Sequence, residues 1–457
     1  MNDLSIHGTA AAKANSLRGF LFDTRYADLP APVVAQAKRC LLDLIGVAAA
    51  GSRMPVSRIM RQYAADHLVA RKNPVRLMFD GRKVSLAAAA MAAAATIDGI
   101  DAHDGHALCK GHVGVSVLPT LLALGDMGRI KDGRDFLTSV VLGYEIGTRL
   151  GIALHSTVPE YHTSGAWGAV TCAALMSRHL RLDWTKTRHA LGAAEYHGPR
   201  SQMMRVIAAP SMVKDGPGWG AMAGVSAALL AAQGYTGAPA VTIEEARVAD
   251  LWADLGARWR ILEQYFKPFP VCRWAQPAME AVQALKAAHG FAPREIESIE
   301  VLSFHEAVAL ATRAPDSTDQ AQYSLPFPVA AYLWRGKLGA AEVSGAALKD
   351  ARILDLSRRV VLTESEEYNH KFPAERWARA IVTLTDGSKL VSPPAVARGN
   401  PENPLSDAEI RAKYRAYSAP VLGAARGKAI ESCVDDLDAP KTPLKKFLDL
   451  LLKPAKR

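Results

Sequence analysis

The sequence predicts a mainly α-helical protein that carries a second domain of the α+β type. Three observations support this prediction. The chain has 457 residues, more than one hydrophobic core usually supports, so we expect two domains. Alanine is abundant and aromatic residues make up only 7% of the chain, which favours closely packed helices over a large sheet. The spacing of apolar residues changes from helical to alternating after about residue 290, and becomes helical again from Ser406.

The first domain is expected to span residues 1–264 and to be all-helical. One helix has Pro32 in its first turn and Gly51 at its expected end. Two further helices, 167–175 and 219–230, are rich in glycine and alanine. Small side chains let helix backbones approach closely, so we expect both helices in the core.

A lid domain of α+β type is expected over residues 265–400. Residues 296–302 and 379–384 alternate between apolar and polar side chains, as half-buried strands do. Asp386 and the glycine after it are typical of a hairpin turn that follows the second strand. Helical spacing returns in residues 401–457, so we expect this segment to pack back on the first domain. The large helical domain is then built from both ends of the chain, with the lid inserted between them.

The composition is that of a soluble globular protein, with 49% apolar and 22% charged residues. No apolar segment near the start has the pattern of a secretory signal, and the alanine-rich run 87–95 is too short to cross a membrane. The five cysteines form no CxxC pair, which favours reduced thiols and a cytoplasmic location. The net charge of +10 suits a small anionic substrate. No nucleic-acid-reading motif is present, so we expect neither a nucleic-acid nor a membrane partner.

A loop rich in aspartate and histidine is the strongest functional signal. Asp101, His103, Asp104 and His106 lie within six residues, and His112 follows soon after. Three interpretations are open: a polar loop that only stabilises itself, a metal site, and a proton-transfer site. The spacing of the histidines gives no helical phase that would aim them at one metal. A histidine near its neutral-pH transition, held by an aspartate, is typical of acid/base chemistry.

Other candidate residues lie in polar segments further along the chain. His162 precedes the helix at residues 167–175, where the helix dipole favours a neutral imidazole. His197 and Arg200 belong to a segment dense in hydrogen-bonding groups. Lys214 comes just before a glycine-rich helix start, a combination that can hold a carboxylate. For each segment, a loop or cap without functional role is the alternative.

The segment from Tyr265 to Trp274 is stiffened by prolines and falls where the helical pattern gives way to the lid. Lys267 and Arg273 place two positive charges beside Cys272. A cleft between domains is a common place for a ligand, and an interdomain linker is the alternative interpretation.

Taken in order, these segments resemble the MmgE/PrpD family, which includes 2-methylcitrate dehydratase, cis-aconitate decarboxylase and iminodisuccinate epimerase. The resemblance covers nearly the whole chain. It rests on an ordered series of motifs, which comprises the aspartate-rich loop ending at His112, Pro119-x-x-Leu-Ala-Leu-Gly-Asp, Tyr161-His-Thr-Ser-Gly-x-Trp-Gly, Lys214 before Gly-Trp-Gly-Ala-Met-Ala-Gly, Gln233-Gly-Tyr-Thr-Gly, Lys267-Pro-Phe-Pro-x-Cys-Arg and Gln322-Tyr323-Ser-Leu-Pro.

The resemblance implies a homodimer without cofactor or metal that acts on a small di- or tricarboxylate. It also implies roles for individual residues. We expect His112 as acid/base, oriented by Asp101, and Lys214 with Lys267 on the substrate carboxylates. His162 and Tyr323 would be further proton donors. The remaining substrate-binding candidates are His106, His197, Arg200, Cys272 and Arg273.

Three positions differ from the decarboxylase branch of this family. Gly105 stands where that branch has a threonine, Cys272 where it has a histidine, and Gln276 where a further histidine is common. These differences leave fewer proton donors on the lid side. We expect a dehydratase or hydratase ahead of a decarboxylase or epimerase. The rival classes are a metal-dependent hydrolase using the cluster from Asp101 to His112 and a carboxylate-binding protein without activity.

Overall fold

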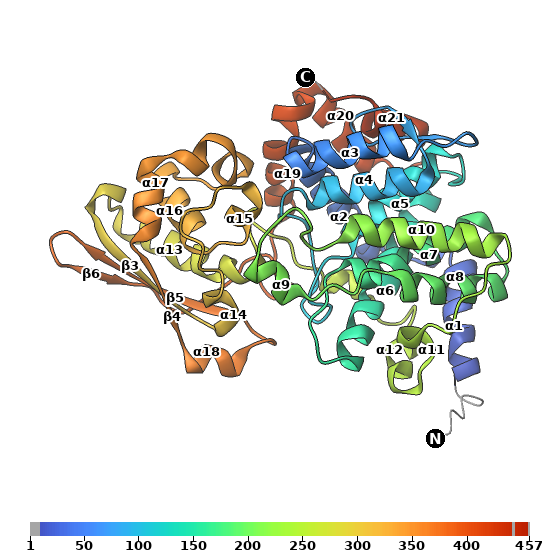
Figure 1. Cartoon of the computed structure of the whole chain (residues 1–457), viewed down its shortest axis with the longest axis horizontal. Coiled ribbons are helices and arrows are strands. Elements are labelled where there is room, and N and C mark those ends of the chain that lie inside the picture. The colour runs from blue at the N-terminus through green and yellow to red at the C-terminus, as the bar shows by residue number, and fades with distance from the viewer. Residues whose placement is uncertain (1–9, 441–443, 456–457) are drawn as a thin grey trace.

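The computed structural model describes residues 10–440 and 444–455 and contains two hydrophobic cores (Figure 1). The first core gathers side chains from Leu17 to Phe266 and again from Leu405 to Leu452. The second gathers side chains from Phe269 to Val382, together with three from α9 (Met203–Ala208). The protein is therefore mainly α-helical with an α+β part, as the sequence predicts.

Helices build the first core, with one short hairpin of β1 (Val75–Arg76) and β2 (Lys83–Val84). From the first part of the chain these helices are α1 (Ala10–Asp23), α2 (Ala31–Gly51), α3 (Pro55–His67), α4 (Leu86–Asp98), α5 (Gly114–Asp126), α6 (Gly133–Thr157), α7 (Gly165–Leu180), α8 (Trp184–His197), α10 (Pro217–Ala232), α11 (Val241–Glu244) and α12 (Ala249–Ala253). The chain end adds α19 (Asp407–Leu422), α20 (Ala424–Asp435) and α21 (Leu444–Leu452), which lie beside α2 to α5 in Figure 1.

The small residues of α7 and α10 let these two helices pack backbone to backbone. A Cβ added at Gly224 would lie 1.9 Å from the carbonyl oxygen of Ala169, and one at Gly220 would lie 2.4 Å from that of Gly165. Such distances are far inside van der Waals contact, so only glycine fits. The close packing confirms that both segments are core helices. It also brings the N-terminal ends of α7 and α10 together, next to the site described below.

Helix α6 is long and apolar enough to cross a membrane, but 94% of its most apolar window is buried inside the protein. It packs on α2, α5 and α7. We therefore interpret α6 as the central helix of the first core.

A mixed sheet organises the second core. Its strands are β3 (Ile296–Ser303), β4 (Val360–Glu364), β5 (Trp377–Leu384), β6 (Lys389–Val391) and β7 (Ala395–Val396), in the order β4-β3-β5-β6 with β7 also on β5. Only β3 and β4 pair in parallel. The helices of this part are α13 (Gln276–His289), α14 (His305–Val308), α15 (Thr318–Gln322), α16 (Pro326–Arg335), α17 (Ala351–Arg358) and α18 (Glu366–Lys371). The predicted strands and the Asp-Gly turn are confirmed, with Gly387 at φ 86°.

Candidate active site

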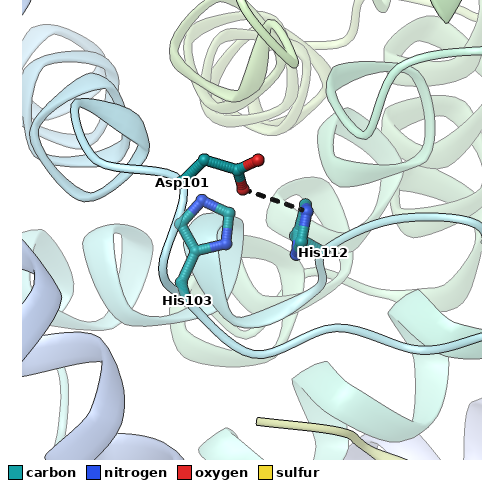
Figure 2. A group of neighbouring side chains, drawn as sticks. All are labelled: Asp101, His103 and His112. Atoms are coloured by element: carbon teal, nitrogen blue, oxygen red, sulfur yellow. Dashed lines mark ion pairs between the residues drawn. The ribbon is translucent and has the colours of Figure 1, made fainter. Parts of the chain in front are cut away.

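Asp101 lies in the loop after α4 and faces the imidazole of His112 (Figure 2). The same carboxylate pairs with the ammonium of Lys267. Its Oδ1 is 3.8 Å from Nε2 of His112 and accepts a hydrogen bond from Nζ of Lys267. All three side chains are buried. Burial by itself would raise the pKa of Asp101, but the charge of Lys267 holds it well below its usual range. Burial likewise opposes the charge of Lys267, and Asp101 raises the pKa of this lysine above its ordinary value.

The other ring nitrogen of His112 fixes its tautomer. Nδ1 lies 2.5 Å from the carbonyl oxygen of Asp104, which can only accept, so Nδ1 carries the hydrogen. The neutral ring then has its lone pair on Nε2, on the side of Asp101. Burial, and next the neighbouring His103 and Lys267, lower the pKa of His112 well below 6.5. The structure therefore favours a neutral imidazole that contacts the Asp104 carbonyl through Nδ1 and faces Asp101 with Nε2.

Gln322 connects this centre to Lys214. Its Oε1 accepts hydrogen bonds from the backbone N–H of Asp101 at 2.7 Å and from Nζ of Lys214 at 2.6 Å. Lys214 has φ 42°, a left-handed backbone that is costly for a residue with a side chain. Its ammonium lies 6.0 Å from the ring centre of Tyr323 and 3.8 Å from Asp319. The sequence predicted Lys214 and Tyr323 but missed Gln322, which is 221 residues away from Asp101.

Asp215 is a second carboxyl group that the sequence analysis missed. The hydroxyl oxygen of Ser164 accepts a hydrogen bond from the backbone N–H of His112 at 2.9 Å. The same hydroxyl donates a hydrogen bond to Oδ2 of Asp215. Burial, and next the charge of Asp98, raise the pKa of Asp215 above its ordinary value. Asp215 can therefore keep a proton close to His112. Its position directly after Lys214, before the glycine-rich helix, was the available signal.

An inner cavity collects most of these groups. Its volume is about 30 Å³, room for about one water molecule. The lining residues are Asp101, Lys110, Gly111, His112, Tyr161, Met203, Asp215, Tyr265, Lys267, Cys272, Arg273, Trp274 and Tyr323. Residues from the loop after α4, the segment before α10, the segment after residue 264 and the end of α15 thus face one space.

Two of the positions that differ from the decarboxylase branch have a structural explanation. A Cβ at Gly105 would lie 2.5 Å from the hydroxyl of Tyr265, so no larger side chain fits beside this tyrosine. The two residues also pair through backbone hydrogen bonds of 3.0 and 2.7 Å. The Gln276 amide donates to the carbonyls of Phe269 and Val271 and thereby holds the segment that carries Lys267. Cys272 lines the cavity, and burial raises its pKa to about 12, so it is a neutral thiol.

Five of the predicted residues do not line the inner cavity. One of them, Lys214, is still joined to Asp101 through Gln322. Nε2 of His106 lies 2.9 Å from Oε2 of Glu263, and both residues line an outer hollow next to the inner cavity. His162 is buried, and its backbone N–H donates to His155. His197 and Arg200 are exposed, because α8 ends at His197 on the surface. Their assignment to substrate binding stays a prediction, which their exposed positions do not support.

A metal ion is the alternative for the Asp101 loop. Ligand atoms of Asp101, His103 and His112 lie within 4.8 Å of one another. A cation bound there would share Asp101 with the ammonium of Lys267, and two positive charges so close repel strongly in a buried site. His103 is also turned to Asp98, with its Nε2 3.3 Å from the carboxylate. The arrangement suits proton transfer better than metal binding.

The fold and the site define a helical and α+β protein with a buried histidine, aspartate and lysine centre. Residues 15–255 match the MmgE/PrpD N-terminal domain and residues 269–439 the MmgE/PrpD C-terminal domain. The chain belongs to the MmgE/PrpD family. It is 25% identical over 467 residues to a cis-aconitate decarboxylase of Aspergillus terreus, covering 94% of both chains. Two similar proteins are also named cis-aconitate decarboxylase. The one from Mus musculus is 24% identical, and the match covers 95% of this chain and 90% of the relative. The one from Homo sapiens is 25% identical, and the match covers 85% of this chain and 84% of the relative.

Proposed function

We propose that this protein is a lyase that removes water from, or adds it to, a small di- or tricarboxylate, starting with abstraction of a proton α to a carboxylate. The observation that carries this proposal is the neutral His112, with its free Nε2 facing the Asp101–Lys267 ion pair at the wall of the inner cavity. Such a base can take a carbon-bound proton at neutral pH.

The charges around His112 suit the intermediate of this reaction. When Nε2 takes the proton, the imidazolium is stabilised by Asp101 at 3.8 Å. Negative charge develops at the same time on the substrate carboxylate, and Lys267 lies beside the base to stabilise it. These charges come from the chain itself, which supports a reaction without added cofactor.

Loss of a β-hydroxyl also needs an acid. Asp215 lines the same cavity and can hold a proton, because burial raises its pKa. Tyr265 and Tyr323 line the cavity as well, and burial raises the pKa of each phenol, so both stay protonated. A base and several proton donors on one cavity favour dehydration over simple epimerisation.

Decarboxylation is the second candidate, favoured by the names of the relatives. Loss of CO2 reaches the same kind of enediolate-like species, so the same lysine could stabilise it. Gly105 and Cys272 argue for a different substrate, since Tyr265 fills the space beside Gly105 and a neutral thiol replaces an imidazole.

The test is a screen of the purified protein with 2-methylcitrate, citrate and cis-aconitate, followed by NMR for water loss or gain and by a CO2 assay. Dehydration or hydration that is lost in His112→Gln supports the proposal. CO2 release from cis-aconitate would instead establish the decarboxylase. Activity that disappears on chelation and returns with zinc or manganese would establish the metal-dependent hydrolase. Binding of these acids without turnover would establish a carboxylate-binding protein.

We also propose a cytoplasmic homodimer. The five cysteines are free and buried, which is in keeping with a reducing compartment. The segment from α8 to α10 exposes large apolar side chains, including Tyr196 at 79% and Trp219 at 53%. A second copy of the chain would cover this surface. Sedimentation equilibrium of the wild type and of Trp219→Glu tests the dimer, which the glutamate should weaken.

A further inference from the structure

Two outer hollows adjoin the inner cavity and share part of its wall. The first outer hollow, of about 620 Å³, shares Lys110, Tyr161 and Trp274 with the inner cavity. The second, of about 670 Å³, shares Tyr265 and Arg273. Each is large enough for a small carboxylic acid, whereas the inner cavity is not. The substrate therefore has to pass these shared side chains.

Arg376 lines both outer hollows, in the segment between α18 and β5. The side chain is half-buried, and its guanidinium lies 5.8 Å from the ring centre of Phe372. Its charge opposes the rise in pKa that burial causes in Tyr161, Tyr265 and Cys272, which line the inner cavity. Its Nε is buried without a hydrogen-bond partner, and within residues 10–440 and 444–455 no carboxylate lies at ion-pair distance from it. A buried charged donor without a partner is costly, so this position favours an anionic ligand.

Two more cations at the wall of the inner cavity are also without a carboxylate partner in the part of the chain that the structure describes. Arg273 is buried and donates only to backbone carbonyls and to the amide of Asn400. Lys110 is half-buried, and its ammonium lies 5.7 Å from the ring centre of Tyr161. By contrast, Lys267 is neutralised by Asp101. The outer hollows are lined by carboxylates as well, Glu160 and Glu306 in the first and Glu263, Glu375 and Glu402 in the second. Arg376 and Lys110 are cations of this lining that form no ion pair with the side chains that the structure describes.

We propose that Arg376, with Arg273 and Lys110, forms a second carboxylate-binding subsite at the entrance, which selects substrates that carry a carboxylate beyond the reacting one. The inference rests on the proposed function for its substrate class. Arg376 lies between α18 and β5, in the part of the chain that builds the second core, and Lys110 lies between α4 and α5, in the part that builds the first. A carboxylate held by both would also keep the two walls of the entrance together over the reacting end of the substrate. The planar guanidinium of Arg376 suits a carboxylate, which it can bind with two parallel hydrogen bonds.

The test uses tricarballylate, a tricarboxylate without a hydroxyl group, so that binding is measured without turnover. Calorimetry should show that Arg376→Gln weakens its binding about tenfold or more, as expected for loss of a charge-assisted hydrogen bond. Arg376→Lys should keep part of the affinity. Arg294→Gln is the matched control, because Arg294 is exposed in the same part of the protein and lines neither hollow nor the inner cavity. Melting temperatures check that each variant is folded.

A double-mutant cycle tests whether the cations act on one group. If Lys110 and Arg376 hold the same carboxylate, the effects of Lys110→Gln and Arg376→Gln on tricarballylate affinity should not add. Inorganic phosphate titrated in the same way should bind more weakly than tricarballylate. Equal binding would overturn the assignment to carboxylates.

Failure of the proposed function is separable from failure of the subsite. Tricarballylate binding that depends on Arg376 supports the subsite even if no acid is turned over. Unchanged affinity in folded Arg376→Gln, or no binding by the wild type, overturns the subsite even if dehydration is found. Where turnover is measurable, Arg376→Gln should raise KM more than it lowers kcat, since the group is not at the reacting atoms.

Discussion

Nε2 of His112 and Oδ1 of Asp101 face each other at 3.8 Å, while the opposite nitrogen of His112 donates to the carbonyl of Asp104. This arrangement leaves the histidine one lone pair and directs it toward the inner cavity. In the proposed reaction, a backbone group positions the base, and the Asp101 side chain stabilises its protonated form.

Replacing His112 by glutamine should lower kcat/KM by about a hundred- to ten-thousandfold, which is the usual contribution of one placed base. The protein should remain folded, because glutamine keeps a polar group of similar size. His289→Gln is the control, since His289 is exposed at the end of α13. Steady-state kinetics measures the loss of activity, and circular dichroism checks that the variant is folded. Turnover at the wild-type rate in His112→Gln would remove His112 from the mechanism.

The pH dependence of kcat/KM should follow the lowered pKa of His112. The base works only while it is unprotonated, and burial lowers its pKa well below 6.5. Activity should therefore persist to pH values below 6.5 and fall only when the imidazole is finally protonated. A pH profile of the wild type measures this. An acidic limb centred above pH 6.5 would show that another group, or a charged His112, controls the rate.

Asp101→Asn should destabilise the protein by about 3–5 kcal/mol, because Lys267 would be left buried without its partner. The depressed pKa of Asp101 means that this carboxylate stabilises the fold above the pKa it has when unfolded, and that the contribution is lost only in strong acid. The double variant Asp101→Asn, Lys267→Met should regain stability. Denaturant unfolding at pH 7 compares the three proteins, and a double variant no more stable than Asp101→Asn would contradict the ion-pair argument.

Asp104→Asn should stabilise the protein at alkaline pH. Burial, and next the charge of Asp43, raise the pKa of Asp104 to about 7. A raised carboxyl pKa favours the fold at low pH, and this contribution is lost as the pH rises through about 7. Asparagine cannot ionise, so the stability of the variant relative to wild type should rise as the pH rises from about 4, the pKa of an unfolded aspartate, and should level off above about pH 7. Activity should be retained, since only the backbone carbonyl of Asp104 contacts His112.

The sequence predicted helices, strands and reactive loops better than it predicted which side chains contact one another in the fold. The helix with Pro32 in its first turn, the glycine-rich packing of α7 and α10, and the strands β3 and β5 follow from local spacing. The chemistry of Asp101, His112 and Lys267 could be recognised because each residue type is itself reactive.

The missed residues depend on contacts between distant segments. Gln322 is one polar side chain among many, and tertiary packing places it at the site. Asp215 is as reactive as Asp101 but stands beside Lys214, which took the attention in that segment, and its contact with Ser164 appears only in the fold. The sequence left the segment that begins at Tyr265 open between a ligand cleft and a linker, and it gave no sign that the Tyr265 ring occupies the space beside Gly105. His197 is the opposite case: its segment is rich in polar groups, but the end of α8 leaves it exposed and outside the lining of the inner cavity.

The contact between Gly105 and Tyr265 predicts how the substrate preference of this chain could be changed. Gly105→Thr alone should destabilise the protein by about 1–3 kcal/mol or more, because its Cβ would lie 2.5 Å from the Tyr265 hydroxyl. Adding Tyr265→Ala removes the obstacle, so the double variant should be more stable than Gly105→Thr and should gain a hydroxyl donor like that of the decarboxylase branch. Thermal unfolding measures the rescue, and CO2 release from cis-aconitate measures the change in activity. Tyr265→Ala alone controls for the cavity left by the missing ring. A double variant as unstable as Gly105→Thr would mean that a contact other than the one with Tyr265, such as the Gly111 carbonyl at 2.9 Å, excludes the larger side chain.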